Sequence, residues 1–186
     1  MKTPINSGHL YIISGPSGVG KGTIITELLR RRPLHLAVSA TTRPIRSGET
    51  PGKSYYYMSD LEFDQHVQSG DFLEYCTVHT ARYGTLRSEV LDYISQGQDV
   101  LIEIDVQGAK KIKDILPDAV TLFLLPPDMN ELMIRLKGRM TESEDIISAR
   151  IQVAKEELAQ SSWYEYTVVN RDIHTAVEQL LNILSK

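Results

Sequence analysis

The sequence predicts an α/β protein in which helices flank a parallel β-sheet. Short apolar runs alternate along the chain with amphipathic helical patterns, which is typical of parallel sheets with helices on both faces. Two of these runs, at residues 100–104 and 120–125, are largely apolar, as expected of strands that are covered on both sides. A glycine-rich turn joins the first apolar run, at residues 10–13, directly to the first helical pattern.

The other elements follow from the same periodicities. We expect strands at residues 10–13, 34–38, 72–75, 78–83, 100–104, 120–125 and 167–170. We expect helices from the glycine-rich turn to Pro33 and at residues 59–70, 86–97, 108–116, 128–138, 141–158 and 176–184. Capping boxes mark two helix starts, with Ser59 before Glu62 and Thr141 before Glu144. Residues 39–57 are rich in turn formers, so we expect them to be exposed rather than part of the core.

Composition excludes several classes of protein. The chain has 186 residues, and its net charge of −4 argues against a general nucleic-acid or membrane surface. Cys76 is the only cysteine, which rules out an internal disulfide and a cysteine-based zinc site. No apolar run approaches the length of a membrane span, and no secretory signal is visible at the N-terminus. We therefore expect a cytoplasmic protein that binds neither nucleic acid nor a membrane.

The glycine-rich turn predicts a phosphate-binding loop. It comprises Gly15, Pro16, Ser17, Gly18, Val19, Gly20, Lys21, Gly22 and Thr23. Glycines let successive backbone N–H groups point into one concavity, and the following helix N-terminus and Lys21 add positive charge. Gly22 stands where a hydroxyl residue is usual, so Thr23 is the candidate for contact with Mg²⁺. The alternative is a plain strand-to-helix turn, but the position of the lysine favours phosphate binding.

Motifs elsewhere in the chain are more specific than the loop. They are Ser39 to Arg46, Gly48 with Glu49, Gly52 to Tyr55, Phe72 to Glu74, Tyr83 to Thr85, Glu103 to Gly108, Arg135 to Arg139, Arg150, and Val169 with Asn170. Together, and in this order, they resemble the guanylate kinase family over essentially the whole chain. The resemblance implies a P-loop NTPase-type sheet with an inserted segment that binds a nucleoside monophosphate and with a helical lid. It also implies transfer of the γ-phosphoryl group of ATP to GMP, and the use of Mg²⁺ with ATP.

The resemblance divides a single domain, residues 1–186, into three parts. The core comprises about 1–38, 86–127 and 159–186, the GMP-binding segment about 39–85, and the lid about 128–158. The implied ATP-binding residues are the loop, Gly15 to Thr23, and Asn170. The implied GMP-binding residues are Ser39, Arg43, Arg46, Tyr55, Glu74, Tyr83, Thr85 and Asp105. The implied catalytic residues are Lys21, Arg43, Arg135, Arg139 and Arg150.

The chemistry of these residue types agrees with the resemblance. Guanidinium forks suit a dianionic phosphate, and tyrosine hydroxyls can add neutral donors. Guanine has two adjacent N–H donors that a carboxylate such as Glu74 can accept, whereas adenine lacks that pair. Asp105 follows an apolar strand, where open α/β sheets bind their ligands. Glu103, inside that strand, is either a second polar residue of the site or a buried partner of a basic residue.

Each group of residues, taken alone, also has a non-functional interpretation. Arg43 and Arg46 can be solvated loop charges, Glu74 a surface carboxylate, and the arginines of residues 135–150 a solvated helix face. Met140 and Arg171 depart from the family pattern without an evident consequence. One rival function is a kinase for another nucleoside monophosphate, which Glu74 argues against. The other is a non-catalytic protein-binding module, which the intact phosphate loop argues against.

Overall fold

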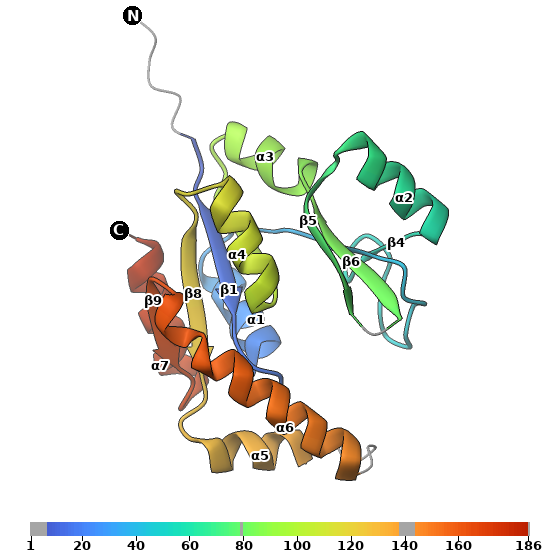
Figure 1. Cartoon of the computed structure of the whole chain (residues 1–186). Helices are drawn as coiled ribbons and strands as arrows, with labels where there is room; N and C mark the ends of the chain where they lie inside the picture. Colours follow the sequence, from blue (N-terminus) through green and yellow to red (C-terminus); the bar gives the residue numbers. More distant parts are fainter. Residues whose placement is uncertain (1–6, 79, 138–143, 186) are drawn as a thin grey trace, which may run out of the picture. The chain divides into compact units, whose positions relative to one another are not determined.

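The computed structural model describes residues 7–78, 80–137 and 144–185, and side chains from residue 148 onward in the last range. Within these residues the strands form two sheets (Figure 1). The five-stranded sheet has the order β2 (His35–Leu36), β7 (Val100–Glu103), β1 (Leu10–Ser14), β8 (Val120–Leu125), β9 (Tyr166–Val169). The four-stranded sheet has the order β4 (Tyr56–Tyr57), β3 (Ala40–Thr41), β6 (Ala81–Leu86), β5 (Phe72–Val78).

The helices alternate with the strands of the larger sheet. They are α1 (Lys21–Arg31), α2 (Asp60–Ser69), α3 (Ser88–Ser95), α4 (Val106–Ile115), α5 (Met129–Lys137), α6 (Glu144–Ala159), the short 3₁₀ helix η1 (Ser161–Trp163) and α7 (Ile173–Leu184). The printed registers of the larger sheet, β2 with β7 and β8 with β9, are both parallel. The predicted α/β class with a mainly parallel sheet flanked by helices is thereby confirmed.

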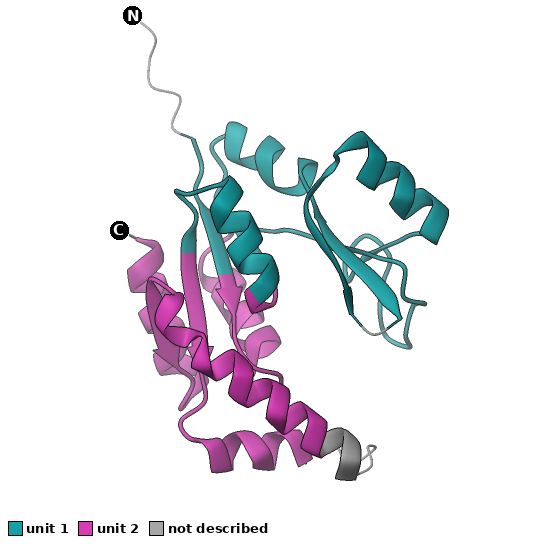
Figure 2. Ribbon diagram, in the orientation of Figure 1, with its two compact units in different colours: residues 1–12, 34–102, 107–120 teal, residues 13–33, 103–106, 121–186 magenta. Residues whose placement is uncertain are grey.

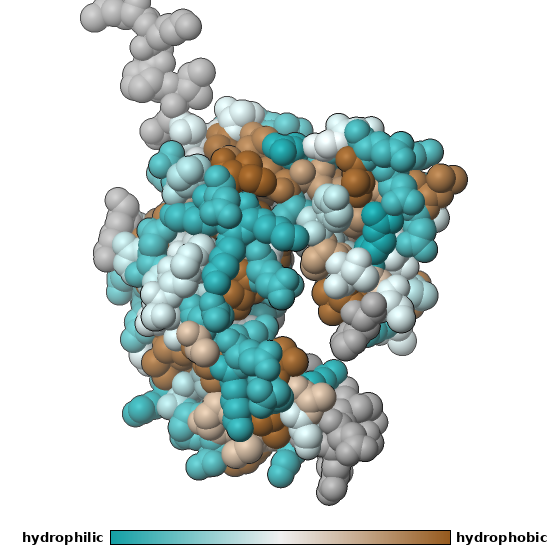
Figure 3. All heavy atoms as spheres, in the orientation of Figure 1, coloured by the Kyte–Doolittle hydropathy of each residue, from teal (hydrophilic) through white to brown (hydrophobic). Residues whose placement is uncertain are grey.

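The chain divides into two compact units (Figure 2). Unit 1 comprises residues 1–12, 34–102 and 107–120, and unit 2 comprises residues 13–33, 103–106 and 121–186. The buried side chains include those of β1 and most of those of β7 and β8, together with Phe63 and Phe72 in the smaller sheet's cluster. On the face drawn in Figure 3, hydrophobic residues form small patches among hydrophilic ones. None of the helices in the described part of the chain is long and apolar enough to cross a membrane.

Local sequence signals locate several elements correctly. Ser59 and Glu62 form a capping box at the start of α2, and Gly70 ends that helix with a φ of 72°. Asp128 accepts a hydrogen bond from the Glu131 N–H and caps α5. β8 has the predicted bounds. The second predicted capping box, at Thr141, lies outside the described residues.

The prediction was wrong in the segment between β2 and α3. Ala40 and Thr41 were expected to be exposed, but they form β3 and are fully buried. The strand expected at residues 78–83 is instead the end of β5 and the start of β6, because the hairpin reverses between Val78 and Ala81. Pairing with distant strands, rather than local propensity, decides these elements.

Candidate functional site

The predicted site residues fall into two groups. The phosphate loop and Asp105 belong to unit 2, and the other predicted GMP-binding residues belong to unit 1. The loop follows β1, and its residue Gly20 is the N-cap of α1 with a φ of 96°. A Cβ at Gly20 would lie 2.7 Å from Asn170 Nδ2, and a Cβ at Gly15 would lie 2.7 Å from the Leu124 carbonyl oxygen. Positive φ and close neighbours together exclude side chains at these two positions. Gly15 and Gly20 are therefore required by the backbone conformation of this turn and by its close packing.

Lys21 folds back over the loop. Its Nζ donates to the carbonyl oxygen of Gly15 at 2.7 Å and to that of Pro16 at 3.3 Å. The first turn of α1 contains no acidic residue. The ammonium group and the positive end of the helix therefore lie together, which suits the binding of a phosphate.

Two residues from distant segments hold the loop at one carbonyl group. Asn170 is 5% exposed and its Nδ2 donates to the Val19 carbonyl oxygen at 2.7 Å. Arg135 donates to the same oxygen at 3.4 Å, while its Nε bonds to Glu131 at 2.9 Å. Both residues were assigned to ATP or catalysis by resemblance alone. The structure gives each a direct contact with the loop.

Asp105 lies at the same end of the sheet as the loop. The Ile104 N–H donates to Ile13, and Ser14 Oγ donates to the Ile104 carbonyl oxygen at 2.7 Å, so the ends of β1 and β7 are neighbours. The side chains of Asp105 and Glu103 are both exposed. A buried Glu103, one of the two alternatives, is therefore wrong.

Sequence reasoning missed Glu157, on α6. Burial raises the pKa of this carboxyl group, and the charge of Asp105 raises it further, while Lys21 and the Ser17 N–H lower it. Glu157 is thus an acidic group beside the phosphate loop. In the sequence Glu157 belongs to the polar face of a helical pattern, which does not indicate that it lies beside the phosphate loop. That position depends on how α6 packs in unit 2.

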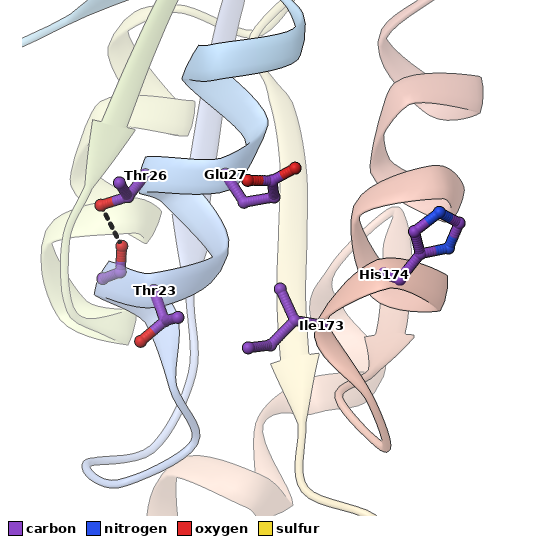
Figure 4. Close-up of a pocket in the computed structure, with 6 residues that line it drawn as sticks. Thr23, Thr26, Glu27, Ile173 and His174 are labelled. Atoms are coloured by element: carbon purple, nitrogen blue, oxygen red, sulfur yellow. Dashed lines mark hydrogen bonds between the residues drawn. The ribbon is translucent and has the colours of Figure 1, made fainter.

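A pocket of about 740 Å³ lies beside the start of α1 (Figure 4). Its lining residues are Gly22, Thr23, Thr26, Glu27, Ile173 and His174. Ile173 of α7 lies on the side that faces α1 (Figure 4). Nothing lies within 4 Å of a Cβ built at Gly22, so the absence of a side chain there is not required by packing.

The predicted lid residues are described only in part. Arg139 and Met140 lie outside the described residues. Arg150 is half-buried on α6, and α5 and α6 pack through the buried Leu132, Leu136 and Ala154. Convergence of the three arginines stays a prediction.

In unit 1 the smaller sheet brings the three predicted base-binding residues together. Glu74 pairs with Thr85 across β5 and β6, and Thr85 Oγ1 donates to Glu74 Oε1 at 3.0 Å. Ala40 pairs with Gly84, so the register continued by one residue places Ser39 opposite Thr85. Glu74 is 6% exposed and lines a pocket of about 450 Å³. The alternative interpretation of Glu74 as a surface carboxylate is therefore wrong.

The predicted phosphate-binding residues of unit 1 gather around Arg43. The Arg43 guanidinium donates to Glu49 Oε1 at 2.7 Å and lies 5.4 Å from the centre of the Tyr55 ring. Tyr55 and Tyr83 meet edge to face at 6.0 Å. The hydrogen bond that Arg43 donates to Glu49 holds the pKa of Arg43 above its ordinary value, against the effect of burial, and Tyr83 adds to this. The Arg46 side chain is exposed.

Glu49 is the organising residue of this loop, a role that the sequence analysis did not give it. Besides Arg43, it accepts hydrogen bonds from the Arg46 N–H at 2.8 Å and from the Tyr57 hydroxyl at 2.7 Å. The hydrogen bond from Arg43, followed by those from Tyr57 and Arg46, lowers its pKa to about 2. The nearby Arg43 and Arg46 are the sequence feature that could have indicated this role of Glu49.

Comparison with known proteins identifies the family of this chain. The guanylate kinase family model matches residues 7–186. The chain belongs to the guanylate kinase family. It is 45% identical to the guanylate kinase of Clostridium tetani over 181 residues, which are 97% of this chain and 87% of the relative. It is 44% identical to the guanylate kinase of Thermobifida fusca over 190 residues, which are 98% of this chain and 97% of the relative.

Solved structures give the same result. The guanylate kinase from Anaplasma phagocytophilum superposes with a TM-score of 0.79 at 31% identity, covering 97% of this chain and 86% of the other. A shikimate kinase from Bacteroides thetaiotaomicron, at 16% identity and a TM-score of 0.54, shares the fold alone. As a member of the guanylate kinase family, this chain is a nucleoside-monophosphate kinase that phosphorylates GMP to GDP at the expense of ATP.

Proposed function

We propose that the two groups of residues hold the two substrates of this reaction. ATP binds to the loop from Gly15 to Thr23 and to Asn170. GMP binds to Ser39, Arg43, Arg46, Tyr55, Glu74, Tyr83, Thr85 and Asp105. We also propose that dGMP is accepted, that the reaction recycles purine nucleotides, and that it takes place in the cytoplasm.

On the donor side, the loop N–H groups, the start of α1 and Lys21 neutralise the phosphates. The residues present fit a bound Mg²⁺, because this ion prefers few protein ligands and takes most of the others from water and substrate phosphates. A magnesium site of this kind does not need three protein side chains as ligands. The described residues contain no group of three His, Cys, Asp or Glu side chains that could hold a metal ion. Thr23, whose hydroxyl lies on the exposed start of α1, is the proposed ligand. Bound Mg²⁺ supplies neutralisation of charge on the β- and γ-phosphates.

The observation that carries the assignment of GMP is the buried pair Glu74 and Thr85. A carboxylate that is 6% exposed and accepts a hydrogen bond from the Thr85 hydroxyl suits the two adjacent N–H donors of guanine. A base without this pair of donors would leave the buried carboxylate poorly matched, which is the strong form of discrimination.

On the proposed reaction path the chain positions two phosphates and neutralises their charge. The acceptor is already an anionic oxygen of GMP, so the reaction needs no strong general base. Arg43 and Arg46 hold the acceptor phosphate, and Lys21 holds the donor. Arg135, Arg139 and Arg150 stabilise the charge that spreads over the transferred group. Exclusion of water by a closed lid protects ATP from hydrolysis.

A coupled assay with ATP against GMP, dGMP, AMP and UMP tests the assignment of the base. We expect turnover of GMP and dGMP, and a large loss of kcat/KM for GMP in Glu74→Gln with no change in KM for ATP. Glu62→Gln is the matched control, since Glu62 is an exposed carboxylate in the same sheet-and-helix segment. If Glu74→Gln leaves kcat/KM for GMP unchanged, or if AMP is the better substrate, Glu74 does not select the base.

A further inference from the structure

A buried carboxylate outside the proposed site joins several segments of unit 1. Glu89 is 8% exposed and lies in the first turn of α3. It follows the end of β6 by three residues, at the point where the chain leaves the smaller sheet. Val38, which it contacts, precedes β3, where the chain enters that sheet. Glu89 therefore connects the entry to and the exit from the segment that carries the proposed GMP site.

Each oxygen of this carboxylate has a defined partner. Oε2 accepts from the Val38 N–H at 2.9 Å and lies 2.9 Å from His35 Nε2. Oε1 accepts from the Tyr56 hydroxyl at 2.7 Å. His35 is in turn stacked on Tyr93 with ring centres 3.4 Å apart. Although burial raises the pKa of Glu89, these hydrogen bonds outweigh it and lower the pKa, so Glu89 is a carboxylate at neutral pH.

These bonds close a ring around Ser39. Glu89 fixes Val38, the residue before Ser39, and it fixes the side chain of Tyr56. The Tyr56 N–H donates to the Ser39 carbonyl oxygen at 2.9 Å. Tyr56 also follows Tyr55 directly in the chain. One buried carboxylate thus constrains the backbone next to two residues of the proposed GMP site.

A helix cap does not account for this geometry, because the partners of Glu89 lie in β2, in β4 and before β3 rather than in α3 itself. Apolar side chains of similar volume often replace a buried polar network without loss of stability. What the carboxylate provides is directional, since it fixes three partners in one arrangement.

We propose that Glu89 is a positioning residue for GMP, which sets Ser39 and Tyr55 through Val38 and Tyr56. The inference rests on the proposed placement of GMP at these two residues. It predicts an effect on one substrate only, because the hydrogen bonds of Glu89 within the described residues go to His35, Val38 and Tyr56 and not to the phosphate loop.

Steady-state kinetics of Glu89→Gln and Tyr56→Phe test the inference. The amide keeps the volume but offers one acceptor oxygen instead of two, so it loses the bond from Val38 or that from Tyr56. We expect KM for GMP to rise by about tenfold in Glu89→Gln and less in Tyr56→Phe, with kcat and KM for ATP changed by less than about twofold. The double variant should show less than the product of the two effects, since the 2.7 Å bond couples the two residues directly.

Two further variants separate the possible failures. Glu62→Gln removes a carboxylate that also accepts from a backbone N–H, in the capping box of α2, and should leave KM for GMP unchanged. An equal rise of KM for GMP in Glu62→Gln, or parallel changes of both KM values in Glu89→Gln, would overturn the positioning role. Ser39→Ala tests the placement of GMP directly. If Ser39→Ala raises KM for GMP and Glu89→Gln does not, the role of Glu89 is wrong and the site stands. If Ser39→Ala has no effect, the proposed site itself fails.

Discussion

The phosphate loop and the smaller sheet reach their geometry by different routes. The loop is one continuous stretch between β1 and α1, and its positive-φ glycines and Lys21 follow one another in the chain. The base-binding residues Ser39, Glu74 and Thr85 come instead from three segments, and the register of β3, β6 and β5 places them next to one another. A site made of contiguous residues tolerates changes elsewhere, whereas a site made by strand pairing depends on the packing of every strand.

The largest effect is expected at Lys21, the charge of the contiguous site. In Lys21→Ala, kcat should fall by about 10²–10³-fold, because a group aimed at the transferring phosphate is lost. The free energy of unfolding should change little, since the Nζ donates to two loop carbonyls of its own segment. Lys155→Ala, at an exposed lysine of α6, is the control. Full kcat in Lys21→Ala would contradict the assignment of the loop as the ATP-binding site.

The matching change in the smaller sheet is Gly84→Ala. A Cβ there would lie 2.8 Å from two ring atoms of Phe72 and 3.1 Å from the Glu74 carbonyl oxygen. We expect a loss of about 1–3 kcal/mol in the free energy of unfolding, from overpacking. KM for GMP should rise as well, because β5 must shift. Denaturant unfolding combined with kinetics measures both, and an unchanged KM would show that the base site does not depend on this register.

A substitution at Asn170 tests whether the phosphate loop depends on a hydrogen bond from a distant segment. Asn170→Ala removes the 2.7 Å bond to the Val19 carbonyl oxygen and leaves only the longer contact from Arg135. We expect a cost of about 1–2 kcal/mol, seen as a rise in KM for ATP with KM for GMP unchanged. Equal increases for both substrates would contradict a role confined to the loop.

A pair of glycine variants separates required from dispensable glycines in the loop. Gly22→Ala should raise the free energy of unfolding by about 0.5–1 kcal/mol, since the position is helical and open. Gly20→Ala should lower it, because of its φ of 96° and the nearby Asn170 side chain. Thermal unfolding of the two variants provides the measurement, and a loss of stability in Gly22→Ala would show that position 22 is constrained after all.

The smallest effect is a pH dependence at Glu49. Its pKa is lowered from 4.5 to about 2, so its contribution to stability is fully present above pH 4.5 and is lost as pH falls toward 2. The difference in unfolding free energy between the wild type and Glu49→Gln should therefore shrink over that window. A difference that stays constant from pH 5 to pH 2 would mean that Arg43 does not hold the carboxylate in solution.

The sequence by itself determined the class of fold, the phosphate loop and the capping of α2. Each depends on neighbours within a few residues or on a local periodicity, and β8 and the α2 box lie where these signals put them. The order of the motifs along the chain also indicated the family that the comparisons establish.

The tertiary structure alone decided which residues meet. Ala40 and Thr41 looked like loop residues but are buried strand residues. They pair with Gly84 and Tyr83 of β6, which lie 44 and 42 residues further along the chain. Glu89 and Glu157 were ordinary acidic residues in the sequence, and their partners lie in other segments. Hydrogen bonds and burial act across space, so a single sequence records the groups that are available but not the pairs that they form.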